Sequence, residues 1–253
     1  MRFLIFLFLP IFVCAAENET LSTGYAFIHS SMNKVNITAD GRSFIPSREN
    51  NLARAFCLNV KCDEDSTAAI VLSNNVSLIV DENSEIFIES VQQPFPINYQ
   101  LNQEFDSSKS VTIIKIKKGS VHFSCPEFRP SSLFIVSTNT AEYSVRAKYT
   151  HFECDEKSDS LFVHDGIVTT ESDNTKKTFA TANRYTINSK ADKLSVSSKP
   201  VSDLTLMKES SQFENIKILK NSVLYNCDNE NNVSAERVVS SLFIKLPGKY
   251  NLY

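Results

Sequence analysis

The four histidines are the residues of this sequence best suited to chemistry, but their spacing matches no familiar site. His29, His122, His151 and His164 lie far apart, so neither an H-E-x-x-H nor an H-x-H metal-binding motif occurs. His122 and His164 each alternate with apolar residues, which predicts that both face solvent on the outer side of a sheet. A metal site shared by these two in three dimensions is the less favoured alternative. We expect no metal ligands.

The remaining reactive residue types give no catalytic arrangement either. His151 and Cys154 could form a thiol–histidine pair, but a buried cysteine at a strand end is favoured. The sequence contains no G-x-S-x-G elbow, glycine-rich phosphate loop or dinucleotide fingerprint. We therefore expect a protein that is not an enzyme, with no catalytic, cofactor-binding or metal-binding residues and no cofactor. The acidic clusters lack the glycine of a calcium loop and are expected to be solvated: Asp63-Glu64-Asp65, Asp81-Glu82, Asp155-Glu156 and Asp228-Asn229-Glu230.

The elements that carry these residues are expected to be short β-strands. Residues 111–170 contain strand-like segments, and alternate residues from Tyr143 to Tyr149 form an apolar face with a period of two. Lys117-Lys118-Gly119 and Asp165-Gly166 are expected to be turns, the second a tight hairpin turn. Arg146 lies opposite the apolar face, and we favour a structural role for it over partner binding.

Two other parts of the chain extend this pattern. Residues 66–89 predict three strands separated by polar corners. Residues 90–110 are expected to be a long loop, because Pro94 and Pro96 argue against a central strand. Such loops are often functional, although a tolerated surface insertion is favoured here.

The order of these segments resembles the FecR family of extracytoplasmic β-domains. Residues 114–121 resemble its strand, glycine, serine-valine element, and residues 134–141 resemble F-x-V-x-T-x-x-A. Residues 161–168 resemble the last strand with x-x-Gly-x-Val. Val145-Arg146 is followed by Ala147-Lys148 where the family usually has Gly-Thr. The resemblance covers residues 24–190 and implies an extracytoplasmic β-domain, without direct anti-sigma activity.

The first residues resemble a secretory signal peptide. Residues 3–16 are uncharged and mostly apolar and follow Arg2, with cleavage expected after Ala15 or Ala16. Cys14 raises the alternative of a lipoprotein, which the bulky Phe12-Val13 disfavours. No other segment approaches the length of a membrane span. We therefore expect a periplasmic or secreted protein.

The charged residues and the cysteines limit which partners and which disulfides are expected. The chain has 26 basic and 29 acidic residues without a basic tract, which argues against nucleic-acid binding. Five cysteines follow the predicted cleavage site, so at least one is unpaired. Cys57 with Cys62 and Cys125 with Cys154 are candidate disulfides, but buried free thiols are at least as favoured, and Cys227 has no assigned partner.

These observations predict an all-β protein, an antiparallel β-sandwich or jelly-roll-like meander with a small C-terminal β extension. The expected units are a signal peptide (1–16), a FecR-like β-domain (17–190) and an extension packing on it (191–253). Residues 188–200 are expected to be a linker, and residues 201–207, 216–219, 223–225 and 241–246 to be strands.

The favoured function is an exported, non-enzymatic interaction or sensing module in the bacterial cell envelope. Its expected partners are envelope proteins or glycan, and the oligomeric state stays open. The first alternative is a structural or glycan-binding envelope scaffold. The second is a hydrolytic enzyme on a β-sandwich, which would need convergent carboxylates in a cleft.

Overall fold

The computed structural model describes residues 21–216, apart from residues 31–33, 47–51, 95–108, 173–174, 182, 191–192, 204 and 215. The predicted signal peptide with Cys14, most of the predicted loop at 90–110, Cys227 and the predicted strands beyond residue 216 lie outside the described residues. Strand β9 continues to Pro94, so the predicted loop begins later than expected.

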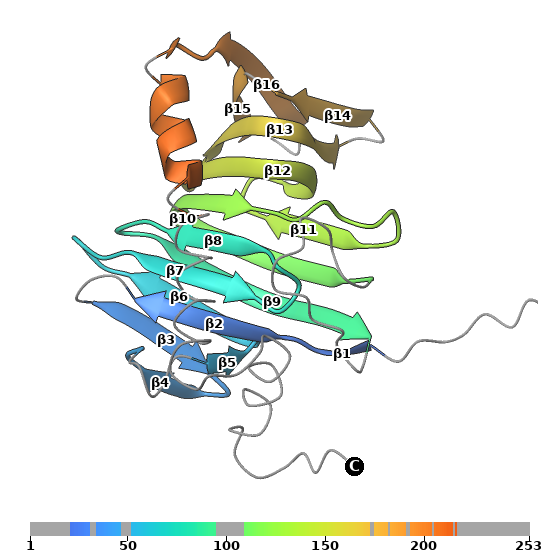
Figure 1. Cartoon of the computed structure of the whole chain (residues 1–253). Coiled ribbons are helices and arrows are strands. Elements are labelled where there is room, and N and C mark those ends of the chain that lie inside the picture. The colour runs from blue at the N-terminus through green and yellow to red at the C-terminus, as the bar shows by residue number, and fades with distance from the viewer. Residues whose placement is uncertain are drawn as a thin grey trace, which may run out of the picture.

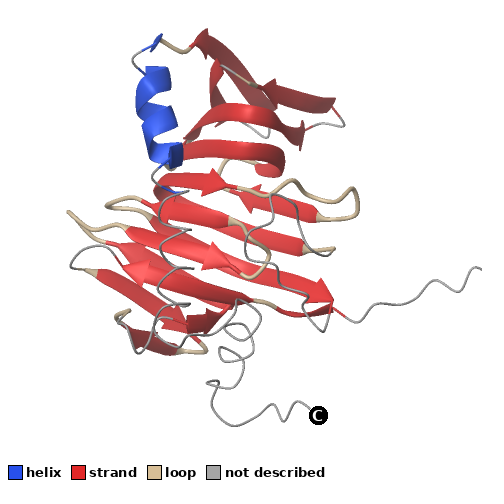
Figure 2. Cartoon of the chain, viewed as in Figure 1, coloured by secondary structure: helices blue, strands red, loops and turns tan. Residues whose placement is uncertain are grey.

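The described chain is all-β, as the sequence predicted, and it also contains a single helix that was not predicted (Figure 2). The strands are β1 (Leu21–Thr23), β2 (Tyr25–Ser30), β3 (Val35–Ala39), β4 (Arg42–Phe44), β5 (Leu52–Arg54), β6 (Phe56–Cys62), β7 (Ala68–Leu72), β8 (Ser77–Val80), β9 (Glu85–Pro94), β10 (Val111–Ser124), β11 (Leu133–Ser137), β12 (Glu142–Cys154), β13 (Ser158–Ser172), β14 (Thr175–Ala180), β15 (Asn183–Lys190) and β16 (Lys193–Pro200).

The strands form two layers, and three long strands are shared between them. The first layer contains β2, β7 and β8, then the C-terminal halves of β10 and β12, the N-terminal half of β13, and β15 with β16. The second contains β3, β6 and β9, then the other halves of β10, β12 and β13 with β11 and β14. Figure 1 shows the strands stacked from β4 and β5 at one end to β14 and β16 at the other. A continuous apolar core lies between the layers.

The shared strands change layer at register shifts near their middle. In β10 the pairing slips between Ile116 and Lys118, and Gly119 follows with φ +90°. Because of this slip, Ile114 and Ile116 point into the core before it, and Val121 and Phe123 do so after it, although the two pairs differ in parity. The turn predicted at Lys117-Lys118-Gly119 is therefore wrong: the glycine bends a continuous strand.

The neighbouring strands bend in the same way. Gly166, with φ +110°, lies within β13 opposite Ala147, so the predicted Asp165-Gly166 hairpin is also wrong. A Cβ on Gly166 would lie 2.5 Å from Ala147 Cα, which explains why no side chain fits. In β12 the register shifts after Ala147 without a glycine, and Tyr149 consequently faces the outside of the first layer rather than the core shared by Tyr143 and Val145.

One strand pair departs from the antiparallel sandwich that the sequence predicted. Strands β10 and β11 are parallel, joined by a connection over residues 125–132. Arg146 holds this connection by donating hydrogen bonds to the carbonyl oxygens of Arg129 (2.9 Å), Pro130 (3.3 Å) and Ser132. Its guanidinium also lies over the Phe128 ring at 5.9 Å. These contacts agree with the structural role expected for Arg146.

The segment after residue 190 differs from its prediction. Strand β16 pairs with β15 along its whole length, so this part is not a linker. The described residues between 203 and 216 are helical rather than a strand, and Ser202 Oγ accepts a hydrogen bond from Thr205 N at the start of this helix. The helix directs Leu206, Phe213 and Ile216 at one face, the spacing of an amphipathic helix. In the described part of the chain, no helix is sufficiently long and apolar to cross a membrane.

Candidate polar site beneath the C-terminal helix

The helix covers part of the outer face of the first layer. Its apolar residues and the sheet form a second, smaller cluster separate from the main core. Tyr149 and Phe213 make an edge-to-face contact there, with ring centroids 5.0 Å apart. The buried members are Ala69, Ile79, Tyr149, Phe162 and Ile216, with Val201, Leu206 and Phe213 packed against them. The helix therefore also buries polar side chains on this face of the sheet.

Two histidines are buried together on this face. His122 of β10 and His151 of β12 are partners in register, and their rings stack with centroids 3.9 Å apart. They are 4% and 6% exposed. His122 does point away from the main core, but the prediction that it faces solvent is wrong because the helix covers it. His164 is partly exposed and packs beside Tyr149 and Phe213 rather than with His122.

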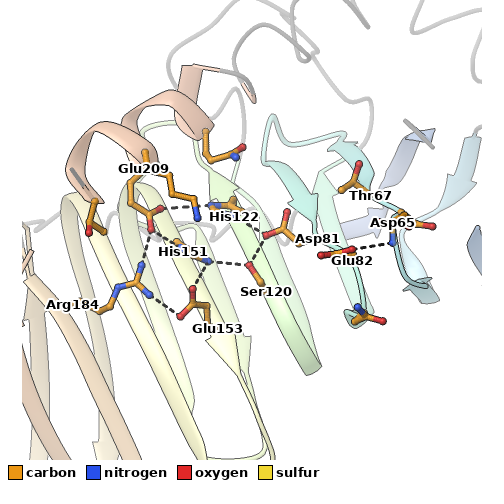
Figure 3. A pocket seen from close by; sticks show the side chains of 15 residues that line it. Asp65, Thr67, Asp81, Glu82, Ser120, His122, His151, Glu153, Arg184 and Glu209 are labelled. Carbon is orange, nitrogen blue, oxygen red and sulfur yellow. Dashed lines mark hydrogen bonds and ion pairs between the residues drawn. The ribbon is translucent and has the colours of Figure 1, made fainter. Parts of the chain in front are cut away.

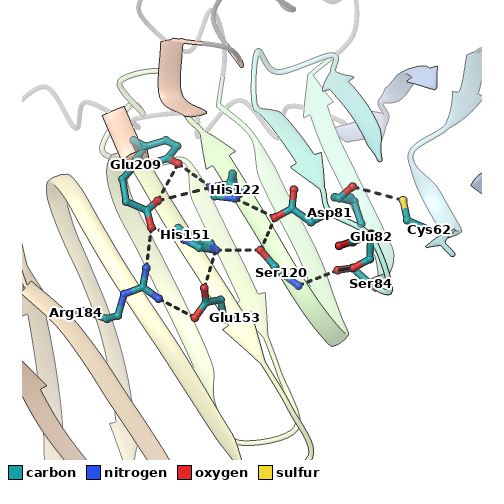
Figure 4. Close-up of polar contacts among 12 residues, drawn as sticks. Cys62, Asp81, Glu82, Ser84, Ser120, His122, His151, Glu153, Arg184 and Glu209 are labelled. Carbon is teal, nitrogen blue, oxygen red and sulfur yellow. Dashed lines mark hydrogen bonds and ion pairs between the residues drawn. The ribbon is translucent and has the colours of Figure 1, made fainter. Parts of the chain in front are cut away.

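The Nδ1 atoms of both rings are engaged on the helix side (Figure 4). His122 Nδ1 lies 2.7 Å from the Tyr149 hydroxyl, and His151 Nδ1 lies 2.9 Å from Glu209 Oε1 of the helix. Arg184 of β15 donates to the same Glu209 oxygen at 2.7 Å and also to Glu153 Oε2 at 2.7 Å. Glu209 is only 4% exposed, so the helix contributes a buried carboxylate that is paired with His151 of β12 and with Arg184 of β15.

The Nε2 atoms meet a second carboxylate on the other side. His122 Nε2 lies 3.1 Å from Asp81 Oδ2, at the end of β8. Ser120 Oγ lies 2.5 Å from the same Asp81 oxygen and 3.0 Å from His151 Nε2. Glu153 Oε1 is 3.7 Å from His151 Nε2. Asp81, His122 and His151 can each offer one ligand atom, and these atoms lie within 4.8 Å of one another.

The group lines a cleft of ≈ 790 Å³ between the strand ends and the helix (Figure 3). Acidic residues outnumber basic ones around it, with Asp65, Asp81, Glu82, Glu153 and Glu209 against Arg184 and Lys208. The cleft is therefore suited to a cationic ligand.

Burial and charge pairing act on the pKa values of this group in opposite directions. Burial tends to raise the pKa of Asp81 and of Glu209, but hydrogen bonds and charge from the two histidines outweigh it, so both pKa values lie below the ordinary range. Burial lowers the pKa of His151 despite the hydrogen bond to Glu209. Burial beside Glu209 raises the pKa of the Tyr149 hydroxyl, which stays protonated.

The four cysteines within the described residues take no part in this site. Cys57 is exposed, and Cys62, Cys125 and Cys154 are buried free thiols, so neither candidate disulfide is formed. Cys154 belongs to the main core, on the opposite face of β12 from His151, which separates the two members of the suggested thiol–histidine pair. Burial raises the pKa of Cys62 to about 12 and also that of Cys154, so these thiols are not activated nucleophiles.

Of the acidic clusters predicted to be solvated, one contributes a residue that hydrogen-bonds to His122, and the other described clusters lie outside this hydrogen-bonded group. Asp81 joins the site, and Glu82 accepts a hydrogen bond from Asp65 N at 2.9 Å. Asp155 caps a turn by accepting from the backbone of Lys157 and Ser158. The cluster at residues 228–230 lies outside the described residues. Only pairing between distant strands reveals Asp81 as a partner of the histidines, and sequence spacing carried no indication of it.

Part of the chain matches the model of a known protein family. Residues 59–169 match the model of the family described as FecR protein, which confirms the resemblance found in the sequence. The matched region extends from β6 to most of β13 and forms the chain's FecR region. It includes Asp81, His122 and His151, whereas Arg184 and Glu209 lie beyond it. No curated protein matches the chain.

The solved structures that resemble the chain include two of candidate anti-sigma factors from Parabacteroides distasonis ATCC 8503. The one solved at 1.65 Å is 10% identical with a TM-score of 0.41, and the match covers 58% of this chain and 62% of that one. The one solved at 2.50 Å is also 10% identical with a TM-score of 0.43, over 77% of this chain and 94% of that one.

Proposed function

We propose that this protein is an exported, non-enzymatic interaction or sensing module of the bacterial cell envelope. The observation that carries the proposal is the FecR region at residues 59–169, which forms the centre of the two-layered sheet. This family's association with signalling supports a regulatory role. Export rests on the signal peptide expected at residues 1–16.

The structure suggests which surface such a module would use. The helix at residues 203–216 follows the FecR region and is held on the sheet by one small apolar cluster and by Glu209. A partner that binds the helix or the adjacent cleft would therefore contact the FecR region and the C-terminal segment together. Envelope proteins are the partners we favour.

The test is to identify partners in the organism that encodes the protein. The chain carries a C-terminal tag, the cells are fractionated, and crosslinked partners are identified by mass spectrometry. Crosslinking to an envelope receptor or transducer, with the mature chain beginning after Ala15 or Ala16, supports the proposal. Recovery in the cytoplasm with residues 1–16 retained contradicts export, and recovery on cell-wall glycan without a protein partner supports a scaffold instead.

A matched control separates specific from nonspecific crosslinking. Glu209→Gln alters the helix contact, whereas Glu214→Gln alters an exposed carboxylate of the same helix. If the partner binds this surface, Glu209→Gln reduces its recovery and Glu214→Gln leaves it unchanged.

A further inference from the structure

Three side chains that line the cleft form a candidate ligand set: Asp81 directly follows β8, His122 belongs to β10 and His151 to β12. Asp81, His122 and His151 supply one carboxylate and two imidazoles whose ligand atoms lie within 4.8 Å of one another. Imidazole nitrogen and carboxylate oxygen at such spacing are the ligands that zinc and related divalent ions use in proteins. Both histidines are almost fully buried, so their rings are held in place rather than free to rotate in solvent.

The hydrogen bonds behind the rings are those of a metal site. A metal-bound histidine normally gives its other ring N–H to a carboxylate or another oxygen, which fixes its orientation. Here His151 Nδ1 faces Glu209 at 2.9 Å and His122 Nδ1 faces the Tyr149 hydroxyl at 2.7 Å. Both Nε2 atoms are consequently directed to the side where Asp81 lies.

When both histidines carry their proton on Nδ1, the hydrogen-bond donors on that side are too few for the acceptors. The single proton of Ser120 Oγ lies between Asp81 Oδ2 at 2.5 Å and His151 Nε2 at 3.0 Å, and it can satisfy only one of them. If His151 donates its Nδ1 proton to Glu209, its Nε2 lone pair needs the same proton that Asp81 needs. A cation between Asp81 and the two Nε2 atoms satisfies all three acceptors and leaves the Ser120 proton for a remaining lone pair of Asp81.

We propose that Asp81, His122 and His151 bind one divalent transition-metal ion, with zinc as the preferred ion. The two nitrogen ligands disfavour calcium and magnesium, which take oxygen ligands. Glu153, whose Oε1 lies 3.7 Å from His151 Nε2, or a water from the cleft completes four-coordination. Through Glu209 the bound ion also fixes the helix, because the carboxylate that orients His151 belongs to that helix. The inference stands apart from the proposed partner-binding function.

The first test is zinc titration of the purified protein by isothermal calorimetry. Cys57→Ser is used as the parent, because this exposed thiol could bind zinc nonspecifically. The parent is expected to bind one zinc ion. Asp81→Asn, His122→Gln and His151→Gln should each weaken binding at least about 10-fold, and Glu209→Gln about 10-fold as an orienting residue. His164→Gln, a histidine of the same outer face outside the ligand set, should bind like the parent.

A second measurement needs no variant, so it remains informative if a substitution prevents folding. Zinc added to the ¹⁵N-labelled parent should shift the Nε2 resonances of two of the four histidines in NMR spectra. Two shifted Nε2 resonances together with weaker binding in the ligand variants support the site. Three results overturn the site: failure of the parent to bind zinc, binding in all three ligand variants as tight as in the parent, or zinc shifts at other histidines.

Discussion

Two cores of different chemistry lie on opposite faces of the first layer. The inner one, between the layers, is almost wholly apolar and includes edge-to-face contacts of Phe123 with Phe134 and Phe152. The outer one, beneath the helix, combines a few apolar side chains with the paired charges around His122 and His151. The inner core is built from many strands, whereas the outer one depends on a single helix.

The difference is that the same strands bury apolar side chains on one face and paired charges on the other. Apolar burial between the layers contributes the free energy of folding without specifying a ligand. The outer face buries charges that are costly unless paired, and it places them at the edge of a cleft. Substitutions on the two faces should therefore lower the free energy of unfolding by different amounts and with a different dependence on pH.

The largest expected effect is on the inner core. Phe123→Ala removes a fully buried ring and should lower the free energy of unfolding by about 3–5 kcal/mol. Phe213→Ala, on the half-buried side of the helix, should lower it by about 2 kcal/mol or less. Denaturant unfolding measures both. Equal losses would show that the outer cluster supports the fold as much as the inner core does.

The next effect concerns the bends that join the layers. Gly119→Ala combines a positive φ with a Cβ that would lie 2.6 Å from Ser84 Cα, so we expect a loss of about 3 kcal/mol or more. Gly41→Ala is the matched control, because Gly41 has φ +73° but no atom within 4 Å of the added Cβ. It should lose about 1 kcal/mol. Similar unfolding midpoints for the two variants would contradict the close approach at Gly119.

A smaller, pH-dependent effect is expected from the helix carboxylate. Glu209→Gln leaves His151 and Arg184 without their buried charge partner and should lower the free energy of unfolding by about 1–3 kcal/mol at pH 7. The pKa of Glu209 lies below its ordinary value when folded, so its contribution is complete above the unfolded pKa and disappears as the pH falls through the folded one. Denaturant unfolding at pH 7 and in acid should show the difference from wild type shrinking, with exposed Glu214→Gln unchanged at both.

The smallest effect, with the opposite pH trend, is expected from Asp159 between the layers. Burial raises its pKa, although its Oδ2 accepts hydrogen bonds from Thr138 and Tyr143 at 2.6 Å each. Its contribution is therefore present below the unfolded pKa and is lost as the pH rises through the folded one. Asp159→Asn keeps the acceptor oxygen without the charge, and should change stability at pH 7 by at most about 1 kcal/mol. Unfolding curves of the variant should depend less on pH than those of wild type, so the loss relative to wild type should be larger in acid than at neutral pH. A loss that instead shrinks in acid would contradict this.

The sequence predicted the inner core better than the outer one. Alternation identified Tyr143, Val145 and Ala147 as core residues, because a strand buried on one face repeats every two residues. It failed at Tyr149, where the shift in β12 reverses the faces. Gly119 and Gly166 were mistaken for turn residues because positive φ serves a tight turn and a bulge equally.

The candidate site was hidden for a different reason. His122, His151 and Asp81 come together only through pairing of β8, β10 and β12, which single-sequence spacing does not encode. The helix left a detectable trace in Leu206, Phe213 and Ile216 after Ser202, which has the spacing and cap of a helix start. The charged Glu209 interrupts that apolar stripe, and the sequence analysis instead predicted separate strands at residues 201–207 and 216–219.

The three shared strands also restrict how the molecule can change shape. Because β10, β12 and β13 run through both layers, the layers cannot slide or separate without breaking covalently continuous strands at their bends. The two layers of the described sheet are therefore covalently tied to each other at three places. The helix, by contrast, contacts a single face of the sheet and follows β16 through residues 201–202.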